Sequence, residues 1–507
     1  MRTVKTLDIP LLDNPSLTGL TRQDQVYRSL RQAILEGRLR RGVQVPSSRE
    51  LASRWSLSRG TIEQAYERLA IEGYLERRQG AGTFVAAQLP EHFLLPDTPC
   101  KVRNSPTSPV PDSKPAPLPD THGMAPCGPG PARQAFIARS ADPLLLDMAR
   151  WRQHLSRATR SIEVDDMHLM QFGGLARLRQ AVAVYVKGVR GIECRAEDVV
   201  ITTGIRQALS LVAGLLPAGA RVAIEDPTYR QAREIFESRG LALQPTPVDQ
   251  EGIRVEALGN TPCAAVYVTP AHQSPLGYTL SASRRAALLD WARHHGSLII
   301  EDDYDSEYNY LKSPPPALKS SDSADHVLFC GSFNKLLYTS LRIGFMIVPQ
   351  SWRAALIQRL YATGAHPGLI EQQALASMIE SGDLYAHIRQ ARRTYQRRRD
   401  IVIQTLSRWI ERPHLSGEHC GFHFVLWLPA SLNDQQIAAE LAAQGLPVRA
   451  LSALALLDRY PPGLQLAFAS ISDDVLRDAS NRLGAHLQRH WQQKPQPRPC
   501  LQASQLA

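Results

Sequence analysis

Three segments carry residue types that together suit one kind of chemistry. Lys335, in GSFNKLLYTSLRIGF, follows a short apolar stretch, with Ser332 three residues before it and Arg342 seven residues after it. Asp302 ends the apolar stretch of SLIIEDDYDSEY, and TTGIRQALSL places Gly204 where a helix is expected to begin. A lysine amine forms an imine with an aldehyde, a carboxylate keeps a pyridine nitrogen protonated, and N–H groups at a helix start bind phosphate. These are the requirements of pyridoxal 5'-phosphate (PLP).

Two tyrosines extend this pattern. Tyr304 lies two residues after Asp302, and Tyr229, in EDPTY, follows another apolar stretch, from which a flat ring can stack on a cofactor. Each feature alone is common, because a lysine is usually a surface charge, an acidic run a solvated loop, and a TTG segment a turn. Their conjunction in one chain predicts a PLP site.

The elements that must position these residues begin at about residue 135. VVITT, RVAIED, AAVYVTP, SLIIEDD, HVLFCGS and GFMIVP are short, apolar and rich in β-branched residues, and helical segments such as RQALSLVAGLL separate them. This order predicts an α/β fold with a mostly parallel, buried sheet. Polar residues gather at the strand ends, and ligands in such sheets bind at the carboxyl ends of strands.

A small N-terminal region has the pattern of three helices and a hairpin. Apolar residues recur at helical spacing over 21–36, Ser47 and Glu50 form a capping box before a second helix, and Ser58 caps a third. LERRQGAGTFVA then alternates like two short strands around a glycine turn. The predicted fold is an all-α winged helix-turn-helix.

The same region is strongly basic. Residues 20–86 hold twelve arginines, no lysines and seven acids, an excess of five positive charges. Any single arginine here fits simple solvation equally well, whereas the ordered set, with arginines at helix starts, favours phosphate contacts. The predicted partner is double-stranded DNA, and the candidate contacts are Arg49, Ser58, Arg59, Thr61, Gln64 and Gly82.

The bulk composition bounds the class of protein. The chain has 507 residues, a formal net charge of +10 and 43% hydrophobic residues, enough for the cores of two or more domains. Its seven cysteines form no CxxC pair, which favours reduced thiols, and neither a signal peptide nor a membrane span is evident. We therefore expect a cytoplasmic protein that does not associate with membranes.

Two further motifs allow a functional and a structural interpretation. HCGFH at 419–423 could indicate a metal site, but a strand is the favoured interpretation because no further ligands lie nearby, so no metal is expected. The arginine-rich segment 389–400 is either a second DNA-facing patch or, as we favour, a charged helix.

The predicted domain organisation follows these patterns. Segment 88–134 holds a dozen prolines and few large apolar residues, which is typical of a tether. We expect an N-terminal tail over 1–19, the winged helix-turn-helix over 20–87, the linker over 88–134, the PLP-binding domain over 135–487 with a small subdomain from about 401, and a disordered tail over 488–507.

The N-terminal region resembles the winged-helix domain of GntR-type bacterial regulators. The resemblance rests on PSSRELA, SRGTIEQAYERL, EGYL and GAGTFV and covers nearly all of residues 22–86. It implies that Arg49, Arg59 and Gly82 approach DNA. Gly60 stands where that family usually has a larger polar residue, which implies the loss of one base contact.

The C-terminal region, from about 135 to 487, resembles the fold type I aminotransferases, and the whole chain resembles the MocR/GabR subgroup of GntR regulators. TPAHQSPLGYTLS and EDDYDSEYNY carry this closer resemblance. It implies that Lys335 is the Schiff-base lysine, Asp302 the partner of the pyridine nitrogen and Tyr304 the partner of O3'. Tyr229 is the implied stacking ring, and the implied phosphate-binding set is Gly204, Ile205, Arg206, Ser332 and Arg342.

Three positions depart from the aminotransferase pattern. Ile205 stands where a small or hydroxylated residue is usual, which removes one hydrogen bond to phosphate. Ser274 stands at the asparagine position of many aminotransferases, so the ring oxygen depends more on Tyr304. Gln465 lies where an arginine usually binds the substrate carboxylate, so bidentate carboxylate binding is weakened.

The resemblance implies a PLP-dependent transcription regulator whose aminotransferase-like domain senses an amine, an amino acid or a B6 vitamer. The alternative is a working aminotransferase that carries a DNA-binding module, in which Lys335 also moves the substrate proton. Gln465 argues against efficient turnover of ordinary amino acids, so a primary enzymatic role is not expected. Fold type I sites are generally completed by a second subunit, which implies a homodimer.

Overall fold

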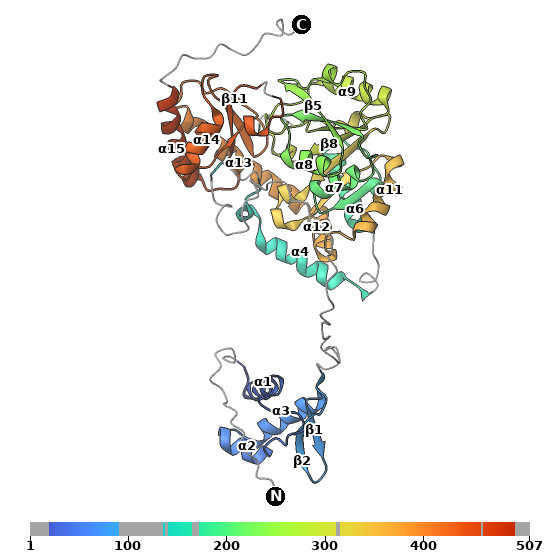
Figure 1. Ribbon diagram of the computed structural model, residues 1–507, viewed down its shortest axis with the longest axis vertical. Helices are drawn as coiled ribbons and strands as arrows, with labels where there is room; N and C mark the ends of the chain where they lie inside the picture. The colour runs from blue at the N-terminus through green and yellow to red at the C-terminus, as the bar shows by residue number, and fades with distance from the viewer. Residues whose placement is uncertain are drawn as a thin grey trace, which may run out of the picture. The chain divides into compact units, whose positions relative to one another are not determined.

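The computed structural model of the chain describes residues 20–90, 135–136, 140–164, 172–310, 315–457 and 460–491. The chain divides into two compact units, Met1–Thr121 and His122–Ala507, and each is described by itself (Figure 1). The predicted tail over 1–19 and most of the predicted linker and C-terminal tail lie outside the described residues. Within the described ranges, no helix is long and apolar enough to cross a membrane.

The N-terminal unit has three helices followed by a two-stranded antiparallel hairpin, which confirms the predicted fold. Each helix begins after a capping residue: the side chains of Thr21, Ser47 and Ser58 accept backbone N–H groups of the first turns. These N–H groups have no partner within the helix itself. The elements are α1 Arg22–Leu35, α2 Ser48–Trp55, α3 Arg59–Ile71, β1 Leu75–Arg78 and β2 Gly82–Val85.

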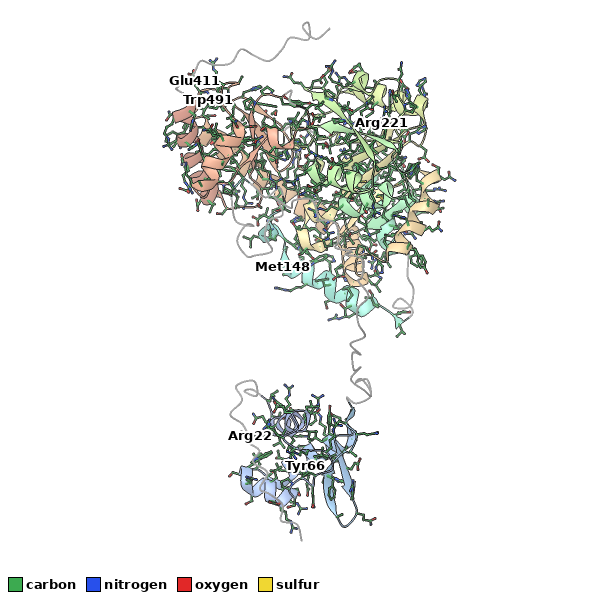
Figure 2. The ribbon with its side chains drawn as sticks, viewed as in Figure 1. Arg22, Tyr66, Met148, Arg221, Glu411 and Trp491 are labelled. Carbon is green, nitrogen blue, oxygen red and sulfur yellow. The ribbon has the colours of Figure 1, made fainter. Side chains whose placement is uncertain are left out.

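The apolar faces of these helices meet in one small core. Ile62 and Leu69 of α3 are fully buried, and Tyr66 is buried with them. The Tyr66 hydroxyl donates to the carbonyl oxygen of Pro46 at 2.8 Å (Figure 2). Leu89 packs into the same core, although it lies in the segment predicted to be linker, so the folded unit extends beyond residue 87.

The C-terminal unit is built on a mixed eight-stranded sheet in the order β3-β10-β9-β8-β7-β4-β5-β6. Strands β5, β4, β7, β8 and β9 run parallel, as expected for buried strands joined through helices. The strands are β3 Val199–Thr202, β4 Arg221–Asp226, β5 Ala242–Asp249, β6 Gly252–Ile253, β7 Ala265–Val268, β8 Leu298–Asp303, β9 Val327–Ser332 and β10 Gly344–Ile347.

Two strands depart from the mostly parallel arrangement that the sequence predicts: β6 pairs antiparallel with β5, and β10 departs as well. β10 pairs antiparallel with both β9 and β3. The chain returns from β9 to β10 through residues 333–343, which is shorter than the dozen or more residues that a parallel crossover requires. This short return holds the segment that carries Lys335 at the end of β9.

Helices cover both faces of the sheet (Figure 1). Successive residues of a strand point to opposite faces, so Leu328 packs in a core with α7, α8 and α11, whereas Phe329 belongs to a core with α6 and α12. The helices are α4 Met148–Ser161, α6 Ala176–Arg190, α7 Ile205–Ala213, α8 Arg230–Ser238, α9 Ala282–His295, α10 Phe333–Leu336, α11 Gln350–Thr363 and α12 Leu369–Glu380.

A smaller antiparallel sheet, in the order β11-β12-β14-β13, follows the long helix α13 Asp383–Leu406. Within α13, Arg398 is buried and pairs with Asp142 at 2.8 Å, which favours the charged-helix interpretation of 389–400. The last helix continues to Trp491 (Figure 2), beyond the predicted domain end at 487. The elements are β11 Leu415–Ser416, β12 His423–Trp427, α14 Asp434–Ala443, β13 Arg449–Ala450, β14 Gly463–Ala467 and α15 Asp473–Trp491.

Candidate cofactor site and candidate DNA interface

Lys335 and Asp302 lie at the edge of the large sheet where β8 and β9 end. Asp302 is near the end of β8, and Lys335 is on α10, which follows β9 directly. Asp302 is buried and accepts a hydrogen bond of 2.7 Å from the hydroxyl of Tyr267 on β7. Burial raises the pKa of Asp302 to about 7, against the lowering effects of that hydrogen bond and of the Lys335 charge. A cationic N–H group placed against Asp302 would favour the ionised carboxylate, which suits the pyridine nitrogen of PLP.

The turn before α7 lies against the segment that carries Lys335. Gly204 caps α7 with a φ of +124°, in the backbone region that favours glycine. A Cβ atom here would lie 2.9 Å from Nδ2 of Asn334, and Oδ1 of Asn334 accepts the N–H of Ile343 at 2.8 Å. Asn334 thus joins two loops of the candidate site. Sequence reasoning missed it, although its place directly before Lys335 was a usable signal.

The other candidate phosphate ligands surround this junction. Ile205 and Arg206 begin α7, where N–H groups and the helix dipole favour an anion. Ser332 ends β9, and Arg342 is exposed with a left-handed φ of +55°. Residues other than glycine adopt this conformation at a cost, often at functional sites. Among the described residues Arg342 has no hydrogen bond or ion pair, so its guanidinium group is available to an anion.

Tyr304 is held by a buried histidine. Its hydroxyl donates to the carbonyl oxygen of His272 at 2.9 Å, and Nδ1 of His272 lies 3.1 Å from Oδ1 of Asp305. His272, Asp305 and Cys420 are all buried and adjacent, so the HCGFH segment contributes Cys420 to the surroundings of this pair. Sequence reasoning missed His272 and Asp305 as site residues, although both lie in the motifs that carry the resemblance.

A second buried carboxylate fixes the loop that carries Ser274. Glu225, on β4, accepts hydrogen bonds from the backbone N–H of Thr269 at 3.1 Å and from its hydroxyl at 2.7 Å. Oγ1 of Thr269 in turn accepts the backbone N–H of Ser274 at 2.9 Å. Burial raises the pKa of Glu225 to about 7, against the lowering effect of the Thr269 hydrogen bonds. Tyr229, the candidate stacking ring, follows the same strand and is half-buried.

Gln465 lies on the face of the small sheet that packs against the Ser274 loop. It pairs with Val425 of β12, so both side chains point to one face, and Val425 packs with Leu276. Gln465 is 1% exposed, and within the described part of the chain its side-chain nitrogen and oxygen have no hydrogen-bond partner. Because an unsatisfied buried amide is costly, this side chain is suited to bind a ligand group.

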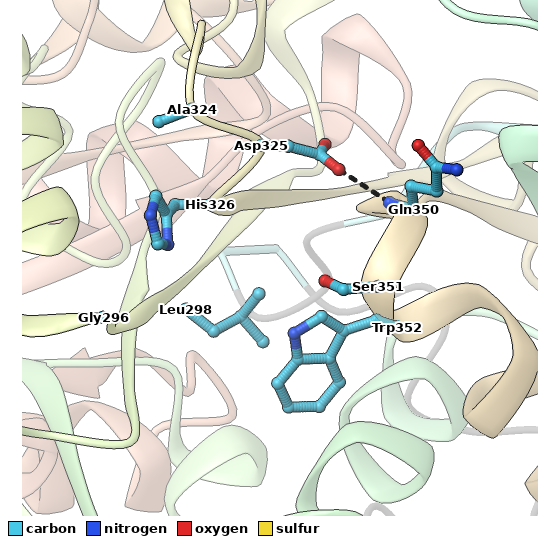
Figure 3. A pocket seen from close by; sticks show the side chains of 8 residues that line it. All are labelled: Gly296, Leu298, Ala324, Asp325, His326, Gln350, Ser351 and Trp352. Carbon is cyan, nitrogen blue, oxygen red and sulfur yellow. Dashed lines mark hydrogen bonds between the residues drawn. The ribbon is translucent and has the colours of Figure 1, made fainter.

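A surface pocket of about 640 Å³ lies at the opposite edge of the large sheet (Figure 3). Leu298 begins β8 and His326 precedes β9, so the pocket is at the amino ends of the parallel strands. Asp325 accepts the backbone N–H of Gln350 there at 2.7 Å. The candidate cofactor residues do not line it. This pocket therefore lies at the amino ends of the parallel strands, whereas Lys335 lies near their carboxyl ends.

The predicted DNA contacts divide into helix-stabilising and exposed residues. Oγ of Ser58 accepts the backbone N–H of Thr61 at 3.1 Å and lies 2.8 Å from the Thr61 hydroxyl, so both side chains hold the start of α3. Arg59 is exposed and pairs with Glu63 at 2.7 Å. Gln64, one turn further along, is also exposed. Arg59 and Gln64 are thus the accessible candidates on α3.

Arg49 and Gly82 lie on other elements of the same unit. Arg49 is exposed in the first turn of α2. Gly82 begins β2 with a φ of +105°, and a Cβ atom there would lie 2.5 Å from Nε2 of Gln44. That amide donates to the carbonyl oxygen of Ala81 at 2.9 Å. Gly82 is therefore needed for the wing itself, apart from any contact with DNA.

The fold and the two candidate sites define a class of protein, a winged helix-turn-helix joined to an aminotransferase fold. The family described as "Bacterial regulatory proteins, gntR family" matches residues 22–85, and "Aminotransferase class I and II" matches residues 141–483. A solved archaeal alanine:glyoxylate aminotransferase has the same fold, with a TM-score of 0.65 and 24% identity over 71% of this chain and 91% of that chain.

Similar full-length proteins carry both parts. PdxR of Corynebacterium glutamicum, named as a pyridoxine biosynthesis transcriptional regulator, is 33% identical over 93% of this chain and 96% of its own length. MocR of Rhizobium meliloti, named as a probable rhizopine catabolism regulatory protein, is 31% identical over 90% of this chain and 92% of its own. The chain belongs to the gntR family, to its MocR/GabR type of transcriptional regulators with an aminotransferase-like domain.

Proposed function

We propose that this regulator holds PLP covalently on Lys335 and changes its binding to DNA when a small molecule occupies the same site. The observation that carries the proposal is the buried Asp302, supported by Tyr267, at the sheet edge where Lys335 and the α7 turn meet. Bound PLP would supply an electrophilic aldehyde carbon and an electron-withdrawing ring. The residues proposed to hold it are Lys335, Asp302, Tyr304, Tyr229, Gly204, Ile205, Arg206, Ser332, Arg342 and Ser274.

Gln465 narrows the class of small molecule. Its amide is neutral and buried on the face that packs against the Ser274 loop. An amide hydrogen-bonds a hydroxyl, a carbonyl or a neutral ring nitrogen, but it lacks the charge and the paired donors with which arginine binds a carboxylate. We therefore favour an amine or a B6 vitamer over an ordinary amino acid. The name of the PdxR relative makes a B6 vitamer the first candidate to test.

We also propose that the working form is a cytoplasmic homodimer on double-stranded DNA. The solved structures that share the fold are aminotransferases, a fold in which a second subunit generally completes the site. Two winged helices would then bind paired half-sites with greater avidity than one. A ligand shifts this DNA binding only if it has different affinities for the two conformations of the protein.

The test measures binding to a DNA fragment selected in vitro with the full-length protein, in the presence and absence of PLP, pyridoxal, pyridoxamine and simple amines. We expect PLP to shift the affinity or the footprint of the normal protein and to leave the Lys335→Ala variant unchanged. Lys187→Ala, which removes an exposed lysine paired with Glu193, is the matched control and should respond normally. The same affinity and footprint in every condition would refute the proposal.

The alternative, a working aminotransferase, predicts a different result. Multiple-turnover transamination of a common amino acid by the unmodified protein would support it. If Gln465 is what prevents turnover, Gln465→Arg should increase the rate with amino acids that carry a carboxylate, whereas Gln465→Leu should not.

A further inference from the structure

Three potential metal ligands meet in the small subdomain, on elements that carry none of the proposed cofactor residues. Glu440 lies on α14, and His486 and His490 lie in the last two turns of α15. The histidines are four residues apart, so they face the same side of the helix. H-x3-H on one helix is a spacing with which proteins hold zinc when a third ligand is nearby. Residues 486–490 have this spacing, as HLQRH, and the fold supplies the carboxylate.

The distances fit a single ion. Nε2 of His486 and Nε2 of His490 each lie 3.2 Å from the same oxygen, Oε2 of Glu440. In a tetrahedral zinc site, metal–ligand distances of about 2.0–2.2 Å place neighbouring ligand atoms about 3.3–3.6 Å apart. The two separations from Oε2 of Glu440 to the histidine nitrogens are therefore close to those that zinc requires, and all three atoms lie within 4.8 Å of one another.

The contact between His486 and Glu440 is short but poorly aligned for a hydrogen bond. Nε2 of His486 is buried and, among the described residues, has no partner with hydrogen-bond geometry, despite its short distance from Glu440. The ring is only 5% exposed, so an unsatisfied nitrogen there is costly. A cation at the centre of the three atoms would satisfy it.

Neighbouring amides orient the ligands as supporting groups do in zinc sites. Nε2 of Gln436 donates to Oε1 of Glu440 at 2.9 Å, which leaves Oε2 to the histidines. The side-chain amide of Gln444 lies 3.2 Å from Nδ1 of His486. The amide nitrogen, Nε2 of Gln444, is the atom placed toward Nδ1. Exchange of the amide's nitrogen and oxygen, which are nearly isosteric, would let Gln444 accept the Nδ1 proton and leave the Nε2 lone pair of His486 for an ion.

We propose that Glu440, His486 and His490 bind one Zn²⁺ ion per chain, with a water molecule as the fourth ligand. The side chains of Glu440 and His490 are 34% and 32% exposed, so the ion has access from solvent. Bound zinc ties α14 to the C-terminal turns of α15. The site is distinct from the edge that carries Lys335.

The test uses the full-length protein without a histidine tag, stripped of metal and titrated with Zn²⁺ in competition with a chromogenic chelator. We expect one equivalent of zinc to bind and to raise the melting temperature. His490→Ala and Glu440→Gln should each weaken binding by about 100-fold or more, and Gln444→Leu by about 10-fold. His294→Ala, which removes an exposed histidine on α9, is the matched control and should bind zinc normally.

Cobalt substitution identifies the ligands independently. Co²⁺ should give the visible bands of a tetrahedral site with nitrogen and oxygen ligands, without the thiolate bands that cysteine coordination would add. Circular dichroism and the melting temperature without metal establish that the variants fold normally. The proposal is overturned if no equivalent of zinc binds, if His490→Ala and Glu440→Gln bind as the normal protein does, or if the cobalt spectrum shows thiolate ligation.

Discussion

The edge of the large sheet that carries Lys335 and Asp302, called the cofactor edge, has buried polar side chains, whereas the outer face of α3 has exposed ones. At the cofactor edge, Asp302 and Glu225 are buried and connected through hydrogen bonds to neighbouring strands and loops. On α3, Arg59 and Gln64 are exposed, and Arg59 pairs with Glu63 on the same helix.

This difference determines whether a substitution alters only the binding of a ligand or also the stability of the fold. Burial makes the ionised form of a carboxylate costly unless a cation lies beside it. The cofactor edge therefore favours the binding of a positively charged group. An exposed arginine contributes little to folding and keeps its charge for a polyanion. Substitutions at the cofactor edge should therefore alter ligand affinity and stability together, whereas substitutions on α3 should alter DNA affinity alone.

The largest effect is expected for Asp302→Asn. The amide has the same shape but lacks the charge that keeps a pyridine nitrogen protonated, so PLP affinity should fall by about 100-fold, or about 2.7 kcal/mol. Equilibrium titration with PLP, followed by the near-visible absorbance of the lysine-bound cofactor, measures this. Asp322→Asn, at another supporting carboxylate outside the site, is the control for general disruption. If Asp302→Asn binds PLP with unchanged affinity, Asp302 does not contact the cofactor.

The same variant should have a pH-dependent effect on the cofactor-free protein. Burial raises the pKa of Asp302 from 3.8 to about 7, so the folded state binds its proton more tightly than the unfolded state. The folding stability of the wild-type protein therefore falls as pH rises from about 4 through 7, because Asp302 must lose its proton. The amide of Asp302→Asn has no proton to lose and causes no such fall. We expect Asp302→Asn to gain up to a few kcal/mol relative to wild type between pH 5 and 8, since one pKa unit is worth about 1.4 kcal/mol. Denaturant unfolding at each pH measures the difference, and a constant difference would contradict it.

A smaller effect, confined to DNA, is expected for Arg59→Ala. Loss of one phosphate contact should weaken operator binding by about tenfold and reduce the dependence of log affinity on log salt by about 1. The melting temperature should not change. Arg38→Ala is a matched control because Arg38 is also exposed and also pairs with a neighbouring carboxylate, Glu36. Equal losses in the two variants would mean that general charge, and not the position on α3, determines binding.

The smallest effect is expected for Ser58→Ala. Removal of an N-cap oxygen costs about 1 kcal/mol, which corresponds to an about fivefold larger population of molecules in which the first turn is open. Hydrogen exchange of the Thr61 amide in the full-length protein measures it, with Ser53→Ala inside α2 as a control that removes no cap. If exchange is unchanged, the hydroxyl contributes little to the start of α3.

Local patterns in the sequence predicted the elements well. Capping residues marked the starts of α1, α2 and α3, because an N-cap acts within one turn. Apolar β-branched runs marked the large strands, because buried strands need such residues on both faces. The direction of β10 was not predictable from its composition, since a buried antiparallel strand has the same apolar residues as a buried parallel strand.

The candidate sites depended on longer-range contacts. The order of motifs sufficed to select Lys335, Asp302 and Gly204, whereas Asn334 and Tyr267 act through partners on other elements. The pair of His272 and Asp305 likewise forms only when two loops meet.

The sequence by itself determined the two kinds of module, their order and the residue types at each strand end, because periodicity, caps and motif spacing are local properties. Only the tertiary structure decided which polar groups are buried together. Asp302 is buried and accepts a hydrogen bond from Tyr267, Gln465 has no hydrogen-bond partner in the described part of the chain, and Glu440 lies beside the histidines of α15. Burial and proximity arise from packing between distant segments, and they set the charge, the unsatisfied hydrogen bonds and the ligand geometry on which function depends.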